Sequence, residues 1–147
     1  MNKKEYEGWV IRAEEVLQSS NLFKDTSRQK IYKSYNGQIS ALGVSIWMSG
    51  LLPTLVIYYQ HQPEGGKGPC RKNVLEVIAK MLGNNETART LLEKVLDLEQ
   101  QKKEATDTQN QEMTKGIAEE ELNKLRTAIV NSSVALKQVV RTYKLED

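Results

Sequence analysis

Apolar residues recur at helical spacing along most of the chain. The first stripe follows the i, i+3, i+4, i+7, i+11 pattern of one helical face and consists of Tyr6, Trp9, Val10, Ala13 and Leu17. Asn2 and Glu5 precede it with the spacing of a capping box. The pattern predicts a first helix from about Lys3 to Gln18.

The stretch from Ser34 to Pro63 contains no Asp, Glu, Lys or Arg, in a chain that is 27% charged. Its apolar stripe recurs at spacings of four, four, three and four and consists of Ile31, Tyr35, Ile39, Leu42 and Ile46. Gly50 and Pro53 interrupt the stretch, and its longest strictly apolar run, LVIYY, is far shorter than the roughly 18–20 residues of a membrane-spanning helix. We therefore expect a buried helix-turn-helix, Ser27–Ser49 and about Leu52–Gln60. A strand at LVIYY is the alternative favoured by β-propensity.

Two polar segments separate the remaining helical stripes. The segment 60–69 has three glycines and two prolines, which predicts a mobile loop. The segment 100–116 has almost no apolar residues, so it forms either a solvated helix extension or a disordered connection. No repeat and no alternation of strands with helices is present. The prediction is an all-α fold of five to six helices, in one domain that covers residues 1–147.

Composition excludes most enzyme classes. Cys70 is the one cysteine and His61 the one histidine, so catalytic triads, Cys-based zinc sites and multi-histidine sites lack their residues. Phosphate-binding glycine motifs and HExxH are also missing. We expect no catalytic activity, no metal and no cofactor. The charged start of the sequence lacks an apolar targeting segment, and a lone thiol suits a reducing compartment, so we expect a cytoplasmic protein with no membrane partner.

The charge is unevenly distributed, although the whole chain carries a formal net charge of only +2. Eight basic and three acidic residues lie between Lys24 and Lys80, whereas ten basic and twelve acidic residues follow from Glu86 onward. A locally positive region suggests contact with a polyanion. Ordinary surface solubility explains the same numbers, and composition does not separate the two interpretations.

One helical face combines cations with small side chains. Lys30 and Lys33 lie opposite the buried stripe of the predicted Ser27–Ser49 helix, and Gly37 and Ala41 continue the same face. Lysines neutralise phosphates, and small residues let another backbone approach closely. The face is therefore a candidate contact for RNA phosphates at its lysines and for a protein at Gly37 and Ala41. A merely solvated face is the equal alternative.

Two further basic clusters are candidates for phosphate contact. They are Arg71 and Lys72, at the start of the helix after the glycine loop, and Lys137, Arg141 and Lys144, along the last helix. We expect no aromatic platform beside any cluster, because Trp9, Tyr35 and Tyr143 fall on predicted core stripes. The contact implied is with phosphates and shape, not with base edges. Sequence alone leaves open whether the three clusters share one face.

The run KIYKSYNGQISALGVSIWMSGLLPTLVIYYQ resembles the central signature of a known family, the small subunit of the type III-B (Cmr) CRISPR effector complex. The matching features are Tyr32, Lys33 and Tyr35, the apolar positions Ile39, Leu42 and Ile46, the turn Gly50-Leu51, and the segment from Leu55 to Tyr59. The tail VALKQVVRTYK is similar to the family's last helix through Leu136, Val140, Arg141 and Tyr143.

The resemblance implies a non-catalytic, all-helical subunit of an RNA-guided ribonucleoprotein. Such subunits stack along the effector filament and contact its other subunits, the guide and target RNA, and copies of themselves. Cleavage belongs to other subunits of that complex. The runner-up interpretation is a helical protein–protein adaptor or oligomerisation module that makes no contact with nucleic acid.

Overall fold

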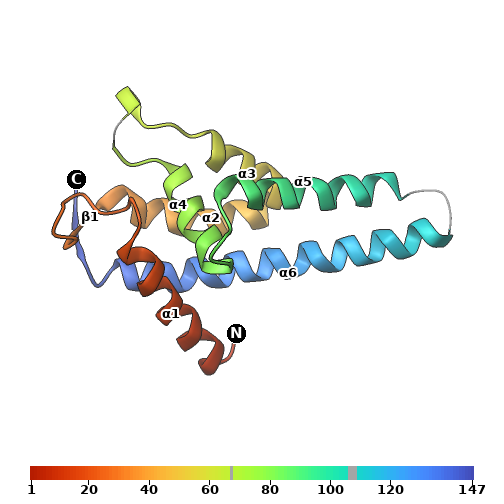
Figure 1. Cartoon of the computed structure of the whole chain (residues 1–147), viewed down its shortest axis with the longest axis horizontal. Coiled ribbons are helices and arrows are strands. Elements are labelled where there is room, and N and C mark those ends of the chain that lie inside the picture. Colours follow the sequence, from red (N-terminus) through yellow and green to blue (C-terminus); the bar gives the residue numbers. More distant parts are fainter. Residues whose placement is uncertain (67, 106–108) are drawn as a thin grey trace.

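The protein has an all-α fold, seen in a computed structural model that describes residues 1–66, 68–105 and 109–147 (Figure 1). Within these ranges six α-helices, a 3₁₀ turn and a two-stranded parallel sheet are formed. The helices are α1 (Lys3–Gln18), α2 (Lys33–Ser49), α3 (Leu51–Gln60), α4 (Arg71–Leu82), α5 (Ala88–Glu104) and α6 (Gln109–Val140). The remaining elements are β1 (Lys30–Tyr32), η1 (Glu64–Gly66) and β2 (Lys144–Glu146). The predicted fold class is confirmed.

Helix α1 has the predicted bounds. The side chain of Asn2 accepts a hydrogen bond from the backbone N–H of Glu5 at 2.8 Å and donates to its carboxylate at 3.2 Å. This reciprocal cap satisfies an N–H that the first helical turn leaves without a partner. Ala13 and Leu17 are fully buried, so the predicted stripe does face the core.

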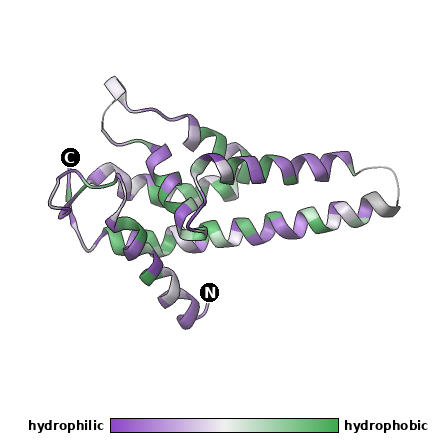
Figure 2. Ribbon diagram, in the orientation of Figure 1, coloured by the Kyte–Doolittle hydropathy of each residue, from purple (hydrophilic) through white to green (hydrophobic). Residues whose placement is uncertain are grey.

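Helices α2 and α3 form the predicted helix-turn-helix at the centre of the core. Tyr35, Ile39, Leu42 and Ile46 are all buried on α2, while the turn between the helices is made by Gly50 with φ of 96°. A side chain there would be strained, which explains why glycine ends α2. The LVIYY segment is helical, so the strand alternative is wrong. Hydrophobic positions concentrate where these helices meet α4 and α6 (Figure 2).

The residues just before α2 depart from the prediction, because the helix begins at Lys33 and not at Ser27. The carboxylate of Asp25 accepts the N–H groups of Gln29 and Lys30, both at 3.1 Å, and Arg28 adopts φ of 56°. This local turn directs 30–32 into β1, which pairs in parallel with β2. Lys30 therefore lies in a strand and not on the helical face assigned to it.

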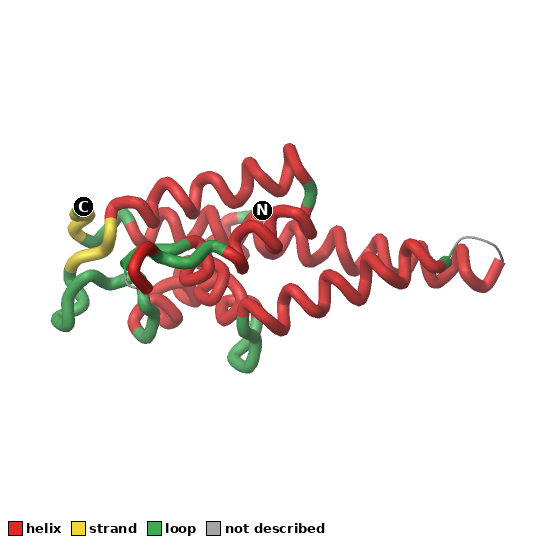
Figure 3. The backbone as a smooth tube through the Cα atoms, turned by 90° about the horizontal axis from the view of Figure 1, so that it is seen from above, coloured by secondary structure: helices red, strands yellow, loops and turns green. Residues whose placement is uncertain are grey.

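The α5–α6 hairpin extends away from the rest of the molecule, and the small sheet lies at the opposite end (Figures 1 and 3). Gln100–Glu104 close α5 and 109–116 open α6, so the solvated helix extension is correct where 100–116 is described. Lys102 and Glu119 join the two helices through an ion pair at 3.9 Å. Residues 106–108 of that segment lie outside the described residues.

The predicted loop 60–69 begins with the last residue of α3 and contains the turn η1. The backbone φ angles of Gly65, Gly66 and Gly68 are 67°, 75° and 103°, and residues other than glycine rarely adopt such conformations. Residue 67 lies outside the described residues, and the predicted mobility of the loop stays a prediction.

Of the helices in the described ranges, none combines the length and the apolar character that crossing a bilayer requires.

Candidate nucleic-acid interface

The small sheet brings two of the predicted basic clusters together. Its parallel register places Lys30 of the first cluster opposite Lys144 of the third. Lys24, Lys30 and Lys144 surround the carboxylate of Glu146, with N–O distances of 4.0, 3.7 and 3.2 Å. We call these three residues the lysine triad. The hydrogen bond from Lys144 and the charges of the triad hold the pKa of Glu146 below its ordinary value.

Lys33 differs from Lys30 in its surroundings. It is the first residue of α2, its side chain is exposed, and it makes no ion pair with any carboxylate in the described part of the chain. The helical-face prediction therefore holds for Lys33 and is wrong for Lys30. Charge that is not shared with an internal carboxylate remains for a partner, so Lys33 is the stronger phosphate candidate of the two.

Lys137 and Arg141 lie at the end of α6. Arg141 is exposed just beyond the helix, and Lys137 is half-buried one turn earlier. Cations at this position also stabilise the helix itself, because the carbonyl end of a helix carries partial negative charge. Figure 1 places this end of α6 beside the sheet and near the start of α2.

The second cluster packs on tyrosine rings. The guanidinium carbon of Arg71 lies 5.8 Å from the ring centroid of Tyr58, and the ammonium of Lys72 lies 4.5 Å from that of Tyr59. Both distances fall in the range of cation–π attraction. The expectation that no aromatic platform lies beside the basic clusters therefore holds at Tyr58, which is buried, and does not hold at Tyr59, whose ring is partly exposed.

The aromatic side chains differ in their exposure. Trp47 of α2 is 77% exposed, and Tyr59 is only partly buried. Tyr35 is fully buried, as predicted, while Trp9 and Tyr143 are partly buried against the core. The predicted core stripes hold in outline, but they do not account for all the aromatic residues.

The second cluster is fixed next to the start of α2. The Tyr35 hydroxyl accepts hydrogen bonds from the backbone N–H of Cys70 at 3.4 Å and from the side chain of Asn73 at 2.9 Å. The backbone N–H of Arg71 donates to Nδ1 of His61 at 2.8 Å. His61 thus connects the end of α3 to the first turn of α4, a role that its place in a polar loop did not predict.

Arg89 is a cation near this cluster that sequence reasoning missed. Its guanidinium carbon lies 5.8 Å from the centroid of the Tyr59 ring, and its Nε lies 2.8 Å from the carboxylate of Glu93. Its hydrogen bond to Glu93 and the charge of that carboxylate raise the pKa of Arg89. In sequence Arg89 is an isolated cation on the first turn of a helix, and nothing local signals its proximity to Tyr59.

The face assigned to protein contact is open. Gly37 and Ala41 are exposed, and a Cβ added at Gly37 would meet no atom within 4 Å. The same face continues into a large apolar surface, because Val44, Trp47 and Met48 are 57%, 77% and 81% exposed. Exposed apolar surface of this kind is typical of interaction sites.

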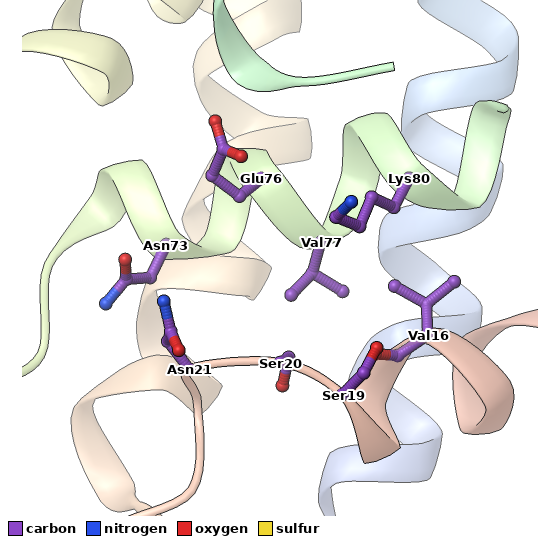
Figure 4. Close-up of a pocket in the computed structure, with 8 residues that line it drawn as sticks. All are labelled: Val16, Ser19, Ser20, Asn21, Asn73, Glu76, Val77 and Lys80. Carbon is purple, nitrogen blue, oxygen red and sulfur yellow. The ribbon is translucent and has the colours of Figure 1, made fainter. Parts of the chain in front are cut away.

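A small cavity lies between α4 and the end of α1 (Figure 4). Its volume is about 90 Å³, room for a few water molecules but not for a nucleotide. The one carboxylate that lines it, Glu76, accepts the backbone N–H of Ala88 at 2.7 Å and so caps α5. The carboxylate of Glu76 therefore serves the start of α5.

The described residues also contain no group of three or more His, Cys, Asp or Glu arranged to hold a metal ion.

Comparisons with known proteins add no assignment. No family model matches the chain, and no curated protein and no solved structure matches it either.

Proposed function

We propose that the protein is a non-catalytic, cytoplasmic subunit of an RNA-guided type III-B CRISPR (Cmr) ribonucleoprotein. In this proposal the protein packs along the effector filament against other subunits. The basic residues at the ends of its helices contact the backbone of guide or target RNA. The resemblance of the α2–α3 segment to the small-subunit signature supplies the family. A free, buried Cys70 is compatible with a reducing compartment.

One structural observation supports the proposed contact with RNA. The predicted cations come from β1, the start of α2, the start of α4, the end of α6 and β2, and all these segments lie at the end of the molecule remote from the α5–α6 tip (Figure 1). A positive region at one end attracts a polyanion. Because phosphates repeat along RNA regardless of sequence, such contacts position the strand without reading its bases.

A charge reversal at Lys33 tests the RNA contact. Lys33→Glu should leave helicity and assembly intact and weaken binding of target RNA, with a shallower dependence on salt and little dependence on sequence. Lys103→Glu is the matched control, because Lys103 is exposed near the far end of α5. Equal target binding by both variants would remove this face from the RNA path.

Lys30→Glu needs separate treatment. It places a second carboxylate beside Glu146 and disturbs the sheet, so its effect on RNA binding must be corrected for any loss of folded protein.

The α2 face supports the second candidate function, a protein–protein adaptor. Gly37→Leu and Ala41→Leu add bulk where the described structure leaves open space or exposed surface. Circular dichroism should show unchanged helicity, and co-purification with neighbouring effector subunits should fall. Normal incorporation of both variants into the complex would contradict a role of this face in assembly. A protein that co-purifies with partners but never engages RNA would favour the adaptor.

A further inference from the structure

Three cations from two other helices lie against two consecutive tyrosines at the end of α3. Tyr58 is 2% exposed, and its hydroxyl donates to the main-chain oxygen of Gln38 at 2.6 Å, which fixes the end of α3 on α2. Tyr59, the next residue, is partly exposed. Arg71 and Lys72 come from the first turn of α4 and Arg89 from the first turn of α5. We call Tyr59, Lys72 and Arg89 the Tyr59 cluster.

The Tyr59 cluster holds two positive charges close together. The Lys72 ammonium is 4.5 Å and the Arg89 guanidinium carbon 5.8 Å from the same ring centroid, so the two cations are at most about 10 Å apart. One strand of a nucleic-acid duplex carries a phosphate every ~3.4 Å along the axis. Two cations within this limit are at most about three phosphate spacings apart along one strand.

Part of the hydrogen-bonding capacity of these cations remains uncommitted, although Arg71 and Arg89 also make side-chain hydrogen bonds with Tyr58 and Tyr59. Neither Arg71 nor Lys72 forms an ion pair with a carboxylate among the residues that the structure describes. A ring attracts the charge but accepts no N–H in the way a carboxylate does. Arg89 is the exception among the three cations, because it forms an ion pair with Glu93. Their side chains are 58% and 56% exposed, so water and salt screen the pair and a phosphate can compete with Glu93.

We propose that the Tyr59 cluster is a phosphodiester-binding site that takes successive phosphates of one RNA strand, with Arg71 extending it. The Tyr59 ring positions the two cations and does not stack on a base. The site deepens the proposed function and rests on it for the identity of the strand as RNA. We expect the isolated chain to bind RNA through this site without its effector partners.

The test measures binding of a fluorescently labelled 20-nucleotide poly-U RNA by anisotropy between 25 and 200 mM NaCl. The test protein is the double variant Lys72→Ala with Arg89→Ala. The control is Lys94→Ala with Lys103→Ala, which removes two exposed cations of α5 that are not part of the cluster. The cluster variant should lower the slope of log K against log salt by about 1.4, at ~0.7 for each phosphate of a single strand that is no longer neutralised. The control should keep the slope of the unmodified chain.

A second pair of variants separates positioning from charge. Tyr59→Phe keeps the ring and should bind as the unmodified chain does, whereas Tyr59→Leu keeps every charge and should bind more weakly. With single-stranded DNA of the same length the cluster variant should show the same reduction in slope, because the contacts are with phosphates. Circular dichroism and thermal unfolding establish that each variant is folded.

Three results would overturn the site: a slope unchanged in the cluster variant, an equal reduction in the control, or no RNA binding by the isolated chain at 25 mM NaCl. The site and the proposed function fail differently. If the cluster variant has the reduced slope but the chain never co-purifies with effector subunits, the site stands and the proposed function falls. If the chain co-purifies and the cluster variant binds RNA normally, only the site falls.

Discussion

Two regions of the molecule each gather three cations, and they use them differently. In the lysine triad all three ammonium groups lie within 4.0 Å of the Glu146 carboxylate. Around Tyr58 and Tyr59, by contrast, Arg89 pairs with a carboxylate, while Arg71 and Lys72 lie over rings and make no ion pair among the described residues. The two sets carry the same number of positive charges, so charge counting does not distinguish them.

The partner of each cation decides what it can do. Ion pairs to Glu146 join β1 to β2 and so contribute to the fold of this end of the chain. Lys72 lies over a ring and makes no ion pair among the described residues, so it keeps its N–H donors for another molecule. Arg71 and Arg89, by contrast, use part of theirs on the tyrosines and on Glu93. We therefore expect the lysine triad to contribute mainly to the fold, and we propose the Tyr59 cluster for binding.

The largest expected effect is on the folding of the sheet. Ile31 lies in β1 and is fully buried, so Ile31→Ala should lower the free energy of unfolding by on the order of 2–5 kcal/mol. Denaturant unfolding followed by circular dichroism measures the loss. RNA binding by the remaining folded protein should keep its salt slope. A stability change under about 0.5 kcal/mol would show that the sheet contributes little to the fold, contrary to the comparison.

A smaller effect on stability is expected at the Tyr59 cluster. Tyr59→Leu removes two cation–π contacts, each worth about 0.5–1 kcal/mol at an exposed site, so unfolding should become easier by about 1–2 kcal/mol. Its main consequence should be weaker RNA binding. If Tyr59→Leu instead unfolded the protein while RNA binding of the folded fraction stayed normal, the assignment of the two regions would be reversed.

The smallest expected effect is the change in stability of the sheet when Glu146 is protonated. The pKa of Glu146 in the folded chain lies below the ordinary 4.5, so its ion pairs stabilise the fold above pH 4.5. That contribution is lost as the pH falls through the lower folded-state value. Hydrogen exchange of the amides of Ile31 and Lys144, which lie in the ladder between the strands, should speed up over this range in the unmodified chain. In Glu146→Gln the change should be smaller after correction for intrinsic pH dependence, and what remains reports Asp25, whose pKa is also lowered by its hydrogen bonds with Ser27, Lys30 and Gln29.

Glu146→Gln also releases the lysine triad from its carboxylate. The freed lysines should then steepen the salt dependence of RNA binding at neutral pH, by up to ~0.7 for each additional phosphate contact. An unchanged slope would mean that these lysines do not face the RNA even when they are free.

The sequence predicted those parts of the fold that depend on residues close together in the chain, such as helix bounds and buried helix faces. The bounds of α1 follow from its Asn2 cap and apolar stripe, and the buried residues of α2 follow from a spacing of three and four. Gly50 ends α2 because the turn needs a positive φ that glycine adopts freely. In each case the cause lies within a few residues of the effect.

The parts that were missed depend on residues distant in the chain. Ile31 and Tyr32 belong to a strand only because 144–146 provides a pairing partner, which no local window contains. Arg89 and Lys72 become neighbours through the ring of Tyr59, and only the packing of α4 and α5 on α3 creates that contact.

The pairing of β1 with β2 also constrains the order in which the chain folds. Lys30 and Lys144 lie about 114 residues apart, so the pair closes a loop that contains five of the six described α-helices. Closing such a loop in an unstructured chain costs on the order of 4 kcal/mol of entropy, more than three short strand residues return. The two strands should therefore meet only after the helices have shortened the path between them. In pulsed hydrogen exchange during refolding, the amides of Ile31 and Lys144 should become protected last, and their protection reports that the segment between the two strands has folded.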